Sequence, residues 1–389
     1  MKLSFDESLK TRGLECARGI ADWICMVQTP GRDRDPASGR FAWMVMEDGE
    51  ETAAQNWNMA FAIMGLLSAS KAFDEPAYED AALAMARYLK TLQIFEPEMG
   101  DRYGAIREKT PQTPWCYTRD ALSAAWAFVE LYRHTGEEFW LERAKLWGQW
   151  FLAHGMDEEG WPLWGHQFGP FFKDREPQMR NDMQGCFQGG SLNFLYHIGK
   201  ETGDPVWTGE VFTRMADHFV RYIQQPSGYF ISVERATKKP PEEDPQGGLH
   251  RSNDDLGTLG LLCAHAVTGN GEYLESVRKF LTGVFASQGE DGRFEKSVAG
   301  IPVVLNTIHE APEMEPVEGV TDQNAARALE ALYRTISDGA KNPRMKGALV
   351  ETGDTFVCAR SSCYALIVLL KLFAGQADYL RVQRVSLRT

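Results

Sequence analysis

The chain has 389 residues, of which 43% are hydrophobic and 24% are charged, as in an ordinary soluble globular protein. Its net charge of −13 at pH 7 argues against nucleic acid or an anionic membrane as the main partner, because both would repel a broadly negative surface. The sequence shows no signal peptide and no uncharged apolar run near the ~18 residues that span a bilayer, so we expect a cytoplasmic protein.

Two kinds of predicted helix alternate along the chain. The first helix, 6–27, has apolar residues on one face, the second, 53–70, is apolar on nearly all sides, and the third, 76–93, is amphipathic again. A helix that is apolar all round is enclosed by protein, whereas an amphipathic helix faces solvent. Further enclosed helices are predicted at 119–134, 182–199, 254–267, 322–337 and 360–374. Further amphipathic helices are predicted at 138–153, 205–224 and 272–287.

The same unit recurs at intervals of 62 to 67 residues, marked by an aromatic residue in a tight turn between two helices. These turn residues are Tyr78, Trp140, Trp207 and Tyr273. A glycine followed by an aromatic residue comes later in most units, from Gly39-Arg40-Phe41 near the start to Gly353-Asp354-Thr355-Phe356 near the end. One helical hairpin cannot bury its own apolar face, so such repeats form stacked or closed arrays. The sequence predicts an all-α (α/α)6 toroid in which 1–389 is a single domain, with the sixth outer helix within 338–350.

Long loops precede the enclosed helices, and they are rich in aromatic residues. Loops of this length in a compact domain are usually functional. We therefore expect them to form one crowded face at the N-terminal ends of the inner helices, where a sugar ring could stack on Trp57, Trp115, Trp164 and Tyr229. The expected loops are 28–52, 94–116, 154–180, 225–252 and 288–320.

Arginines stand at the starts of several predicted inner helices. An acidic residue there caps the helix and favours its positive end, but an arginine gains nothing from that position. Pairing with a neighbouring aspartate is one explanation, and a clamp for a carboxylate or sulfate of a ligand is the other. The arginines are Arg119, Arg180, Arg251 and Arg360.

Aspartates at the same helix starts are candidates for acid–base catalysis. Packed helices lie roughly 8–10 Å apart. Acids on neighbouring helices therefore fall near the separation of a glycosidase pair, about 6.5–9.5 Å for inversion and about 5–5.5 Å for retention. The candidates are Asp120, Asp182 and Asp254.

This double ring with aromatic loops over acidic helix starts resembles the six-hairpin glycosidase-like superfamily. That group includes unsaturated uronyl hydrolases, toroidal polysaccharide lyases and N-acylglucosamine 2-epimerases. The resemblance covers essentially the whole chain and is architectural. The first inner helix begins Gln55-Asn56-Trp57, without the first acid typical of uronyl hydrolases. His265, late in its helix, and His309, in a predicted loop, do not match the paired histidines of the epimerases.

Our leading hypothesis is a glycoside hydrolase that acts at an acidic sugar, preferably a uronide, in an imported oligosaccharide. The arginines would hold the sugar carboxylate, and two of the aspartates would act as acid and base. One alternative is a lyase in which Arg180, Asn181 or His250 neutralises a uronate and Tyr117, Tyr229 or His250 is the base. A sugar epimerase is another, and a non-enzymatic helical-repeat binding protein is the last.

No zinc spacing, phosphate-binding loop or nucleophile elbow is present, so neither a metal nor a cofactor is expected. The expected partner is an acidic oligosaccharide, with a homodimer left open.

Overall fold

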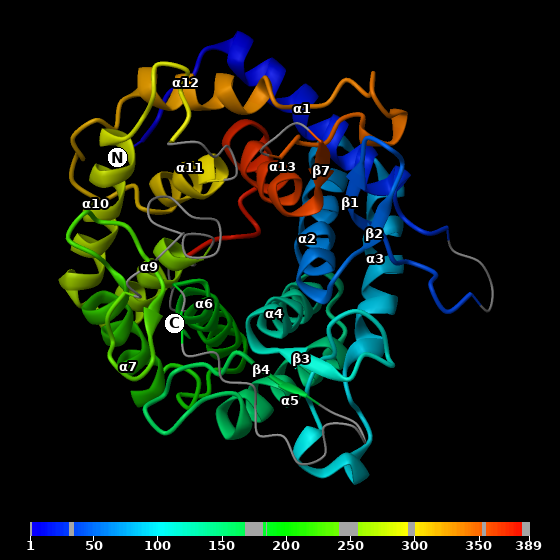
Figure 1. The fold of residues 1–389 in the computed structure, drawn as a ribbon, viewed down its shortest axis with the longest axis vertical. Coiled ribbons are helices and arrows are strands. Elements are labelled where there is room, and N and C mark those ends of the chain that lie inside the picture. Colours follow the sequence, from blue (N-terminus) through cyan, green and yellow to red (C-terminus); the bar gives the residue numbers. More distant parts are fainter. Residues whose placement is uncertain are drawn as a thin grey trace.

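The computed structural model describes residues 2–30, 35–167, 182–183, 185–240, 256–294, 300–351 and 355–382, with backbone alone at 167, 182–183 and 185–188. Helices dominate it and form two concentric rings around a central axis (Figure 1). The inner ring consists of α2 (Asn56–Phe73), α4 (Thr118–Thr135), α6 (Gly185–Thr202), α9 (Gly257–Thr268), α11 (Gly300–Glu310) and α13 (Ala359–Ala374). The outer ring consists of α1 (Glu7–Met26), α3 (Pro76–Leu89), α5 (Glu138–His154), α7 (Glu210–His218), α10 (Gly271–Ala286) and α12 (Asp322–Tyr333).

The inner ring is closed. Each inner helix packs on the next one, and α13 packs back on α2. Burial follows the pattern that the sequence predicts: α2 is buried without interruption from Asn56 to Ala69, whereas α10 buries only one face, which includes Tyr273, Val277 and Phe280. The predicted all-α (α/α)6 toroid is therefore confirmed.

Two helix assignments were wrong. The helix that begins at Asp322 was predicted to be enclosed, but α12 lies in the outer ring and packs on α1. The enclosed helix of that unit is α11, which falls inside the stretch predicted as the loop 288–320 and includes His309. The region 338–350, where we expected the sixth outer helix, contains only the short 3-10 helix Pro343–Met345.

The physical reason lies in the composition of these two helices. Alanines at 325, 326, 328 and 331 make α12 look like an enclosed helix, although alanine also suits a shallow outer face. Gly300 and Pro302 look like loop residues in α11, but proline is tolerated in the first turn of a helix, where its missing N–H has no partner to lose.

The glycine turns of the repeat form a structural joint between neighbouring outer helices. After each outer helix the chain makes one isolated antiparallel bridge, for example Gln28 with Phe41 and Gln224 with Phe230. The glycine two residues before the second bridge residue has a positive φ, between 83° and 102°. These glycines are Gly39, Gly104, Gly160, Gly228, Gly292 and Gly347. The sixth repeat glycine is thus Gly347, and Gly353 lies outside the described residues.

Glutamines hold four of these joints together. The side-chain amide of Gln224 donates to the carbonyl of Gly228 (2.9 Å) and to that of Ser276 on the next outer helix (2.8 Å). Gln28, Gln93 and Gln288 make the equivalent pairs of hydrogen bonds. The repeat seen in the sequence therefore corresponds to a repeated hydrogen-bonded joint.

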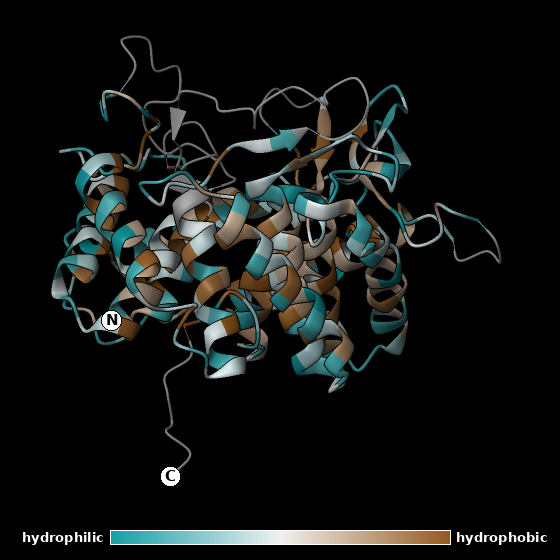
Figure 2. Ribbon diagram, turned by 90° about the horizontal axis from the view of Figure 1, so that it is seen from below, coloured by the Kyte–Doolittle hydropathy of each residue, from teal (hydrophilic) through white to brown (hydrophobic). Residues whose placement is uncertain are grey.

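Short strands, rather than irregular loops alone, cover the N-terminal ends of the inner helices (Figure 2). Strand β1 (Ala42–Met46) pairs with β2 (Glu51–Ala53) and β7 (Phe356–Cys358). Strand β3 (Trp115–Tyr117) pairs with β4 (Gly165–Gln167), and β5 (Asp182–Met183) pairs with β6 (Val233–Glu234). All these pairs are antiparallel. Within the described ranges, no helix has the length and apolar character needed to span a membrane.

Candidate functional site

Three of the predicted site residues meet where α2 and α4 begin. The guanidinium of Arg119 lies over the ring of Trp57, 4.4 Å from its centroid, and its Nη1 is 3.1 Å from Oδ1 of Asp120. All three side chains are largely buried. Pairing with the adjacent aspartate was one of the two explanations for the arginine, and it holds for Arg119.

Glu108 completes this cluster, and the sequence analysis missed it. Its backbone N–H donates to the carbonyl of Trp115 (3.2 Å), and its own carbonyl accepts from the N–H of Asn56 (2.9 Å). The loop before β3 is thereby fixed to the start of α2. This places the Glu108 carboxyl in hydrogen-bond contact with that of Asp120.

The carboxyl groups of Glu108 and Asp120 interact with each other. Burial raises the pKa of Glu108 well above its usual value, and the charge of Asp120 raises it further. No N–H or hydroxyl group of the described residues donates to either oxygen of Glu108. A hydrogen bond between two carboxyl groups needs one of them to be protonated. Because Glu108 is 0% exposed and Asp120 is 9% exposed, Asp120 is the member of the pair that a ligand can reach.

Aromatic side chains line the rim beside this pair. The rings of Trp115 and Tyr117 lie 6.5 Å apart, and those of Tyr117 and Trp164 lie 6.2 Å apart. The N–H of Thr118, the first residue of α4, donates to the carbonyl of Trp164 (3.0 Å). The structure thus brings together three of the aromatic residues that the sequence placed at the site.

Several buried polar atoms near these helix starts have no hydrogen-bond partner among the described residues, and two of them belong to the first residues of the helices. These two are Oδ1 of Asn56 in α2 and Oγ1 of Thr118 in α4. Buried polar groups are normally satisfied. Such atoms suit a bound water or a hydroxyl group of a ligand.

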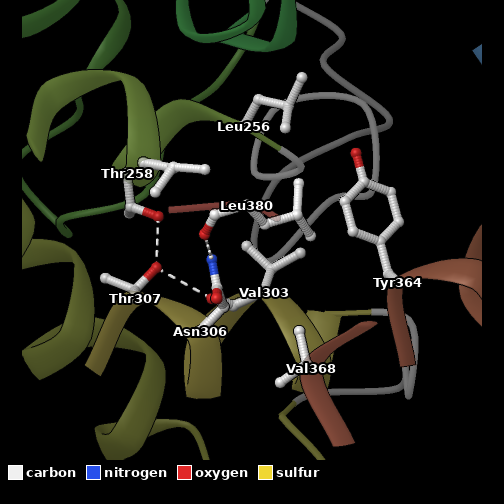
Figure 3. A pocket seen from close by; sticks show the side chains of 9 residues that line it. Leu256, Thr258, Val303, Asn306, Thr307, Tyr364, Val368 and Leu380 are labelled. Atoms are coloured by element: carbon white, nitrogen blue, oxygen red, sulfur yellow. Dashed lines mark hydrogen bonds between the residues drawn. The ribbon is translucent and has the colours of Figure 1, made fainter. Parts of the chain in front are cut away.

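The inner helices enclose a small cavity of about 10 Å³, enough for roughly one water molecule. Figure 3 shows Tyr364 and Val368 of α13 on one side of it and Thr258 and Thr307 on the other. The ring of Tyr364 lies 4.6 Å from that of Phe61, which in turn lies 6.5 Å from Trp57. Aromatic contacts therefore connect this cavity with the cluster around Arg119.

The C-terminal segment closes the centre of the ring at this cavity. Leu380 lines the cavity, and its carbonyl accepts hydrogen bonds from Lys371 Nζ (2.7 Å) and Asn306 Nδ2 (3.0 Å). Lys371 Nζ also donates to Glu310 (2.7 Å), whose other oxygen accepts from the N–H of Val382 (2.8 Å). Buried charged and polar groups thus hold the segment in place.

Tyr229 does not join the other aromatic residues. Its hydroxyl bonds to Ser287 Oγ (2.9 Å) and to the carbonyl of Gly283 (3.3 Å), next to outer helix α10. Its role as part of a sugar platform is therefore corrected: it belongs to the joint between outer helices.

Arg360 is the second residue of α13, partly exposed, and is separated from Arg119 by α2. Asp182 lies in β5, with its backbone alone described. The remaining predicted residues lie outside the described residues: Arg180, Asn181, His250, Arg251 and Asp254.

In the part of the chain that the structure describes, no group of three or more His, Cys, Asp or Glu side chains could hold a metal ion. The described cluster consists of carboxyl groups, a guanidinium and aromatic rings.

Residues 23–192 match the sequence model of the N-acylglucosamine 2-epimerase (GlcNAc 2-epimerase) family. This stretch includes Trp57, Glu108, Arg119 and Asp120. No curated protein matches the chain in sequence.

Solved structures match the fold over nearly the whole chain. Cellobiose 2-epimerase from Bacillus thermoamylovorans matches with a TM-score of 0.70 at 13% identity, covering 96% of this chain and 100% of that one. An unsaturated glucuronyl hydrolase specific for heparin gives 0.65 at 15% identity, covering 95% and 98%. A glycoside hydrolase family 76 mannosidase from Bacteroides thetaiotaomicron gives 0.62 at 14% identity, covering 92% and 98%.

Proposed function

Since the fold is that of the six-hairpin glycosidase-like superfamily, we propose that this protein is a carbohydrate-active enzyme that epimerises a reducing sugar at the carbon next to its carbonyl. The family model supports this reaction class, because its match includes both α2 and α4 with their cluster of site residues. The observation that carries the proposal is the contact between the fully buried carboxyl of Glu108 and the carboxyl of Asp120 at the start of α4.

The spacing of the two carboxyls favours proton transfer over glycoside hydrolysis. Carboxyl groups in hydrogen-bond contact are closer than the roughly 5–5.5 Å of a retaining pair and the roughly 6.5–9.5 Å of an inverting pair. No room is left between them for a glycosidic bond or a water nucleophile. The pair instead acts as one acid–base unit, as a reaction that removes and returns a proton requires.

In this proposal Asp120 exchanges the proton with the sugar, because it is the member of the pair that reaches the surface. In the open-chain form of the sugar the hydrogen next to the carbonyl is acidic. Its removal by the Asp120 carboxylate gives an enediolate. Rotation of this intermediate about the bond between C2 and C3 turns its other face to the protonated Asp120, and return of the proton there gives the epimer, so atoms and charges balance. Glu108 acts through Asp120 as a positioning residue. Arg119 orients the Asp120 carboxylate and stacks on Trp57.

Hydrolysis at an acidic sugar is the second candidate. The observation that favours it is the largely buried guanidinium of Arg119 beside Trp57, since arginine is suited to bind a carboxylate and tryptophan to stack on a sugar ring. In that case Asp120 would pair with an acid beyond Glu108.

The protein can be incubated with free reducing sugars and with uronic-acid glycosides. The mass and the ultraviolet absorbance of the products then distinguish these reactions. Epimerisation leaves the mass unchanged and gives a second sugar on chromatography. Hydrolysis adds one water, and a lyase produces an unsaturated product that absorbs in the ultraviolet. Water addition to a uronide without any epimer formation would overturn the epimerase proposal.

A further inference from the structure

The glycine joints give every unit of the ring the same register. Four residues after the turn glycine, the chain reaches the rim at Trp43 in the first unit, Glu108 in the second, Trp164 in the third and Ser232 in the fourth. In the sixth unit the same count from Gly347 reaches Glu351. Glu108 and Glu351 therefore occupy equivalent positions in two different units.

The helices that follow them begin in the same way. Trp115 and Phe356 each stand three residues before the helix, and their carbonyls accept from the N–H groups of Glu108 (3.2 Å) and Glu351 (2.9 Å). The second helical residue is an arginine in both units, Arg119 or Arg360.

The strands match as well. Strand β3 pairs with β4, which follows Trp164, and β7 pairs with β1, which contains Trp43. The candidate site thus has a counterpart on the same face of the ring, made of Glu351, Arg360, Ser361 and Trp43, which we call the second subsite.

The second subsite differs from the first at one decisive position. The third residue of the helix is Asp120 in α4 but Ser361 in α13. The hydroxyl of Ser361 donates to Oε1 of Glu351, and the thiol of Cys358 donates to the same oxygen (3.2 Å). Glu351 is thus surrounded by donors, whereas Glu108 faces another carboxyl group. The surroundings of Glu351 therefore suit a group that accepts hydrogen bonds, and not one that shares a proton with a second carboxyl group.

Trp43 adds a further feature of a sugar site. It is partly exposed, yet its indole Nε1 is buried and has no hydrogen-bond partner among the described residues. Strand β1, which contains Trp43, is joined to the strand that leads into α13. An aromatic ring, a carboxyl group and an arginine on one face of the ring offer a stacking surface together with acceptors and donors for hydroxyl groups.

We propose that the second subsite binds an uncharged sugar ring linked to the ring that reacts at Asp120, so that the natural substrate is a disaccharide or longer. This inference rests on the proposed function for the identity of the reacting ring. Helices α13 and α4 both pack on α2. Their starts are therefore at most roughly 16–20 Å apart, two helix spacings around the same opening. The carboxylate of Glu351 favours hydroxyl groups and repels a uronate.

Calorimetric binding of glucose, mannose, cellobiose and maltose tests the proposal without requiring turnover. The wild type should bind at least one disaccharide more tightly than either monosaccharide. Glu351→Gln keeps the shape of the side chain but removes the charge, and Trp43→Phe keeps an aromatic residue in β1 but removes the indole N–H. Each should weaken disaccharide binding by about tenfold, near 1.4 kcal/mol, and monosaccharide binding much less. The exposed Glu290→Gln is the matched control and should bind as the wild type does.

Two results would overturn the second subsite. One is a wild type that binds no disaccharide more tightly than glucose or mannose. The other is equal weakening of monosaccharides and disaccharides by Glu351→Gln in a protein with unchanged circular dichroism. Disaccharide binding that depends on Glu351 without any epimerisation would support the subsite and refute the proposed reaction. Epimerisation of monosaccharides with no preference for disaccharides would support the proposed reaction and refute the second subsite.

Discussion

At the scale of single residues, the proposed chemistry depends on two carboxyl groups that come from different parts of the chain. Asp120 was predicted because it starts an inner helix, and Arg119 and Trp57 were predicted with it. Glu108 was missed because it stands alone in a long loop, and only the folded loop brings it to Asp120. Its position four residues after Gly104, the turn glycine of that unit, was the available signal.

Asp120→Asn should abolish most of the activity. Asparagine keeps the size of the side chain but cannot exchange a proton, and general acid–base catalysis is typically worth about 10²–10⁴ in rate. The measurement is kcat/KM on the substrate found in the sugar screen, with the exposed Asp338→Asn as control. A loss of less than tenfold would assign the proton transfer to another residue.

Glu108→Gln should change how stability depends on pH. Below the ordinary glutamate pKa of 4.5, Glu108 is protonated in both the folded and the unfolded chain, so its favourable contribution is fully present. As the pH rises toward the raised folded value, the unfolded chain loses this proton first, and the folded state is progressively disfavoured. Glutamine cannot ionise. The Tm of the variant relative to wild type should therefore increase as the pH rises above 4.5.

The control for this experiment is the exposed Glu290→Gln, whose Tm difference from the wild type should stay nearly constant with pH. A flat difference for Glu108→Gln as well would mean that Glu108 is ionised in the folded protein and shares no proton with Asp120.

At the scale of elements, the alternation of enclosed and amphipathic helices was enough to predict both rings. It failed for α12, because small apolar side chains such as alanine occur both in enclosed helices and on the shallow faces of outer helices. The glycine–aromatic pattern was recognised as a repeat, but its role was not. The glycine turn packs on the outer helix of the next unit. The sequence pattern within one unit does not show which other unit the turn contacts.

The close approach at this joint gives a sharp prediction. Gly228 has a φ of +96°, and a Cβ added there would lie 2.3 Å from the carbonyl oxygen of Lys279. Gly269 also has a positive φ, +71°, but open space surrounds it. Gly269→Ala should cost about 1–2 kcal/mol from backbone conformation alone, and Gly228→Ala about 1–3 kcal/mol more from the clash. Urea unfolding of the two variants measures the difference, and equal costs would contradict the close packing.

At the scale of the whole molecule, the ring is completed by contacts between distant parts of the chain. Helix α13 packs on α1 and α2, and the segment after it returns to the centre, where Leu380 lines the cavity in Figure 3. This return could not be predicted from the sequence, because the segment has no repeat partner. Its anchors, Lys371, Asn306 and Glu310, lie on two different helices.

Lys371→Met should cost about 3–5 kcal/mol, because it leaves Glu310 as a buried carboxylate without its cation. The double variant Lys371→Met with Glu310→Gln should recover part of this loss, since the unpaired charge is then gone. Chemical denaturation of the two single variants and the double variant gives the coupling free energy. Additive effects would show that the pair does not hold the C-terminal segment.

The most direct test of the central claim, a proton exchanged at the sugar carbon by Asp120 and its buried partner, is a reaction in deuterated water. The wild type should produce an epimer that is one mass unit heavier through a deuterium at the carbon next to the carbonyl, and Asp120→Asn should incorporate almost none. An epimer without deuterium at that carbon, or incorporation that is equally fast with Asp120→Asn, would contradict this account.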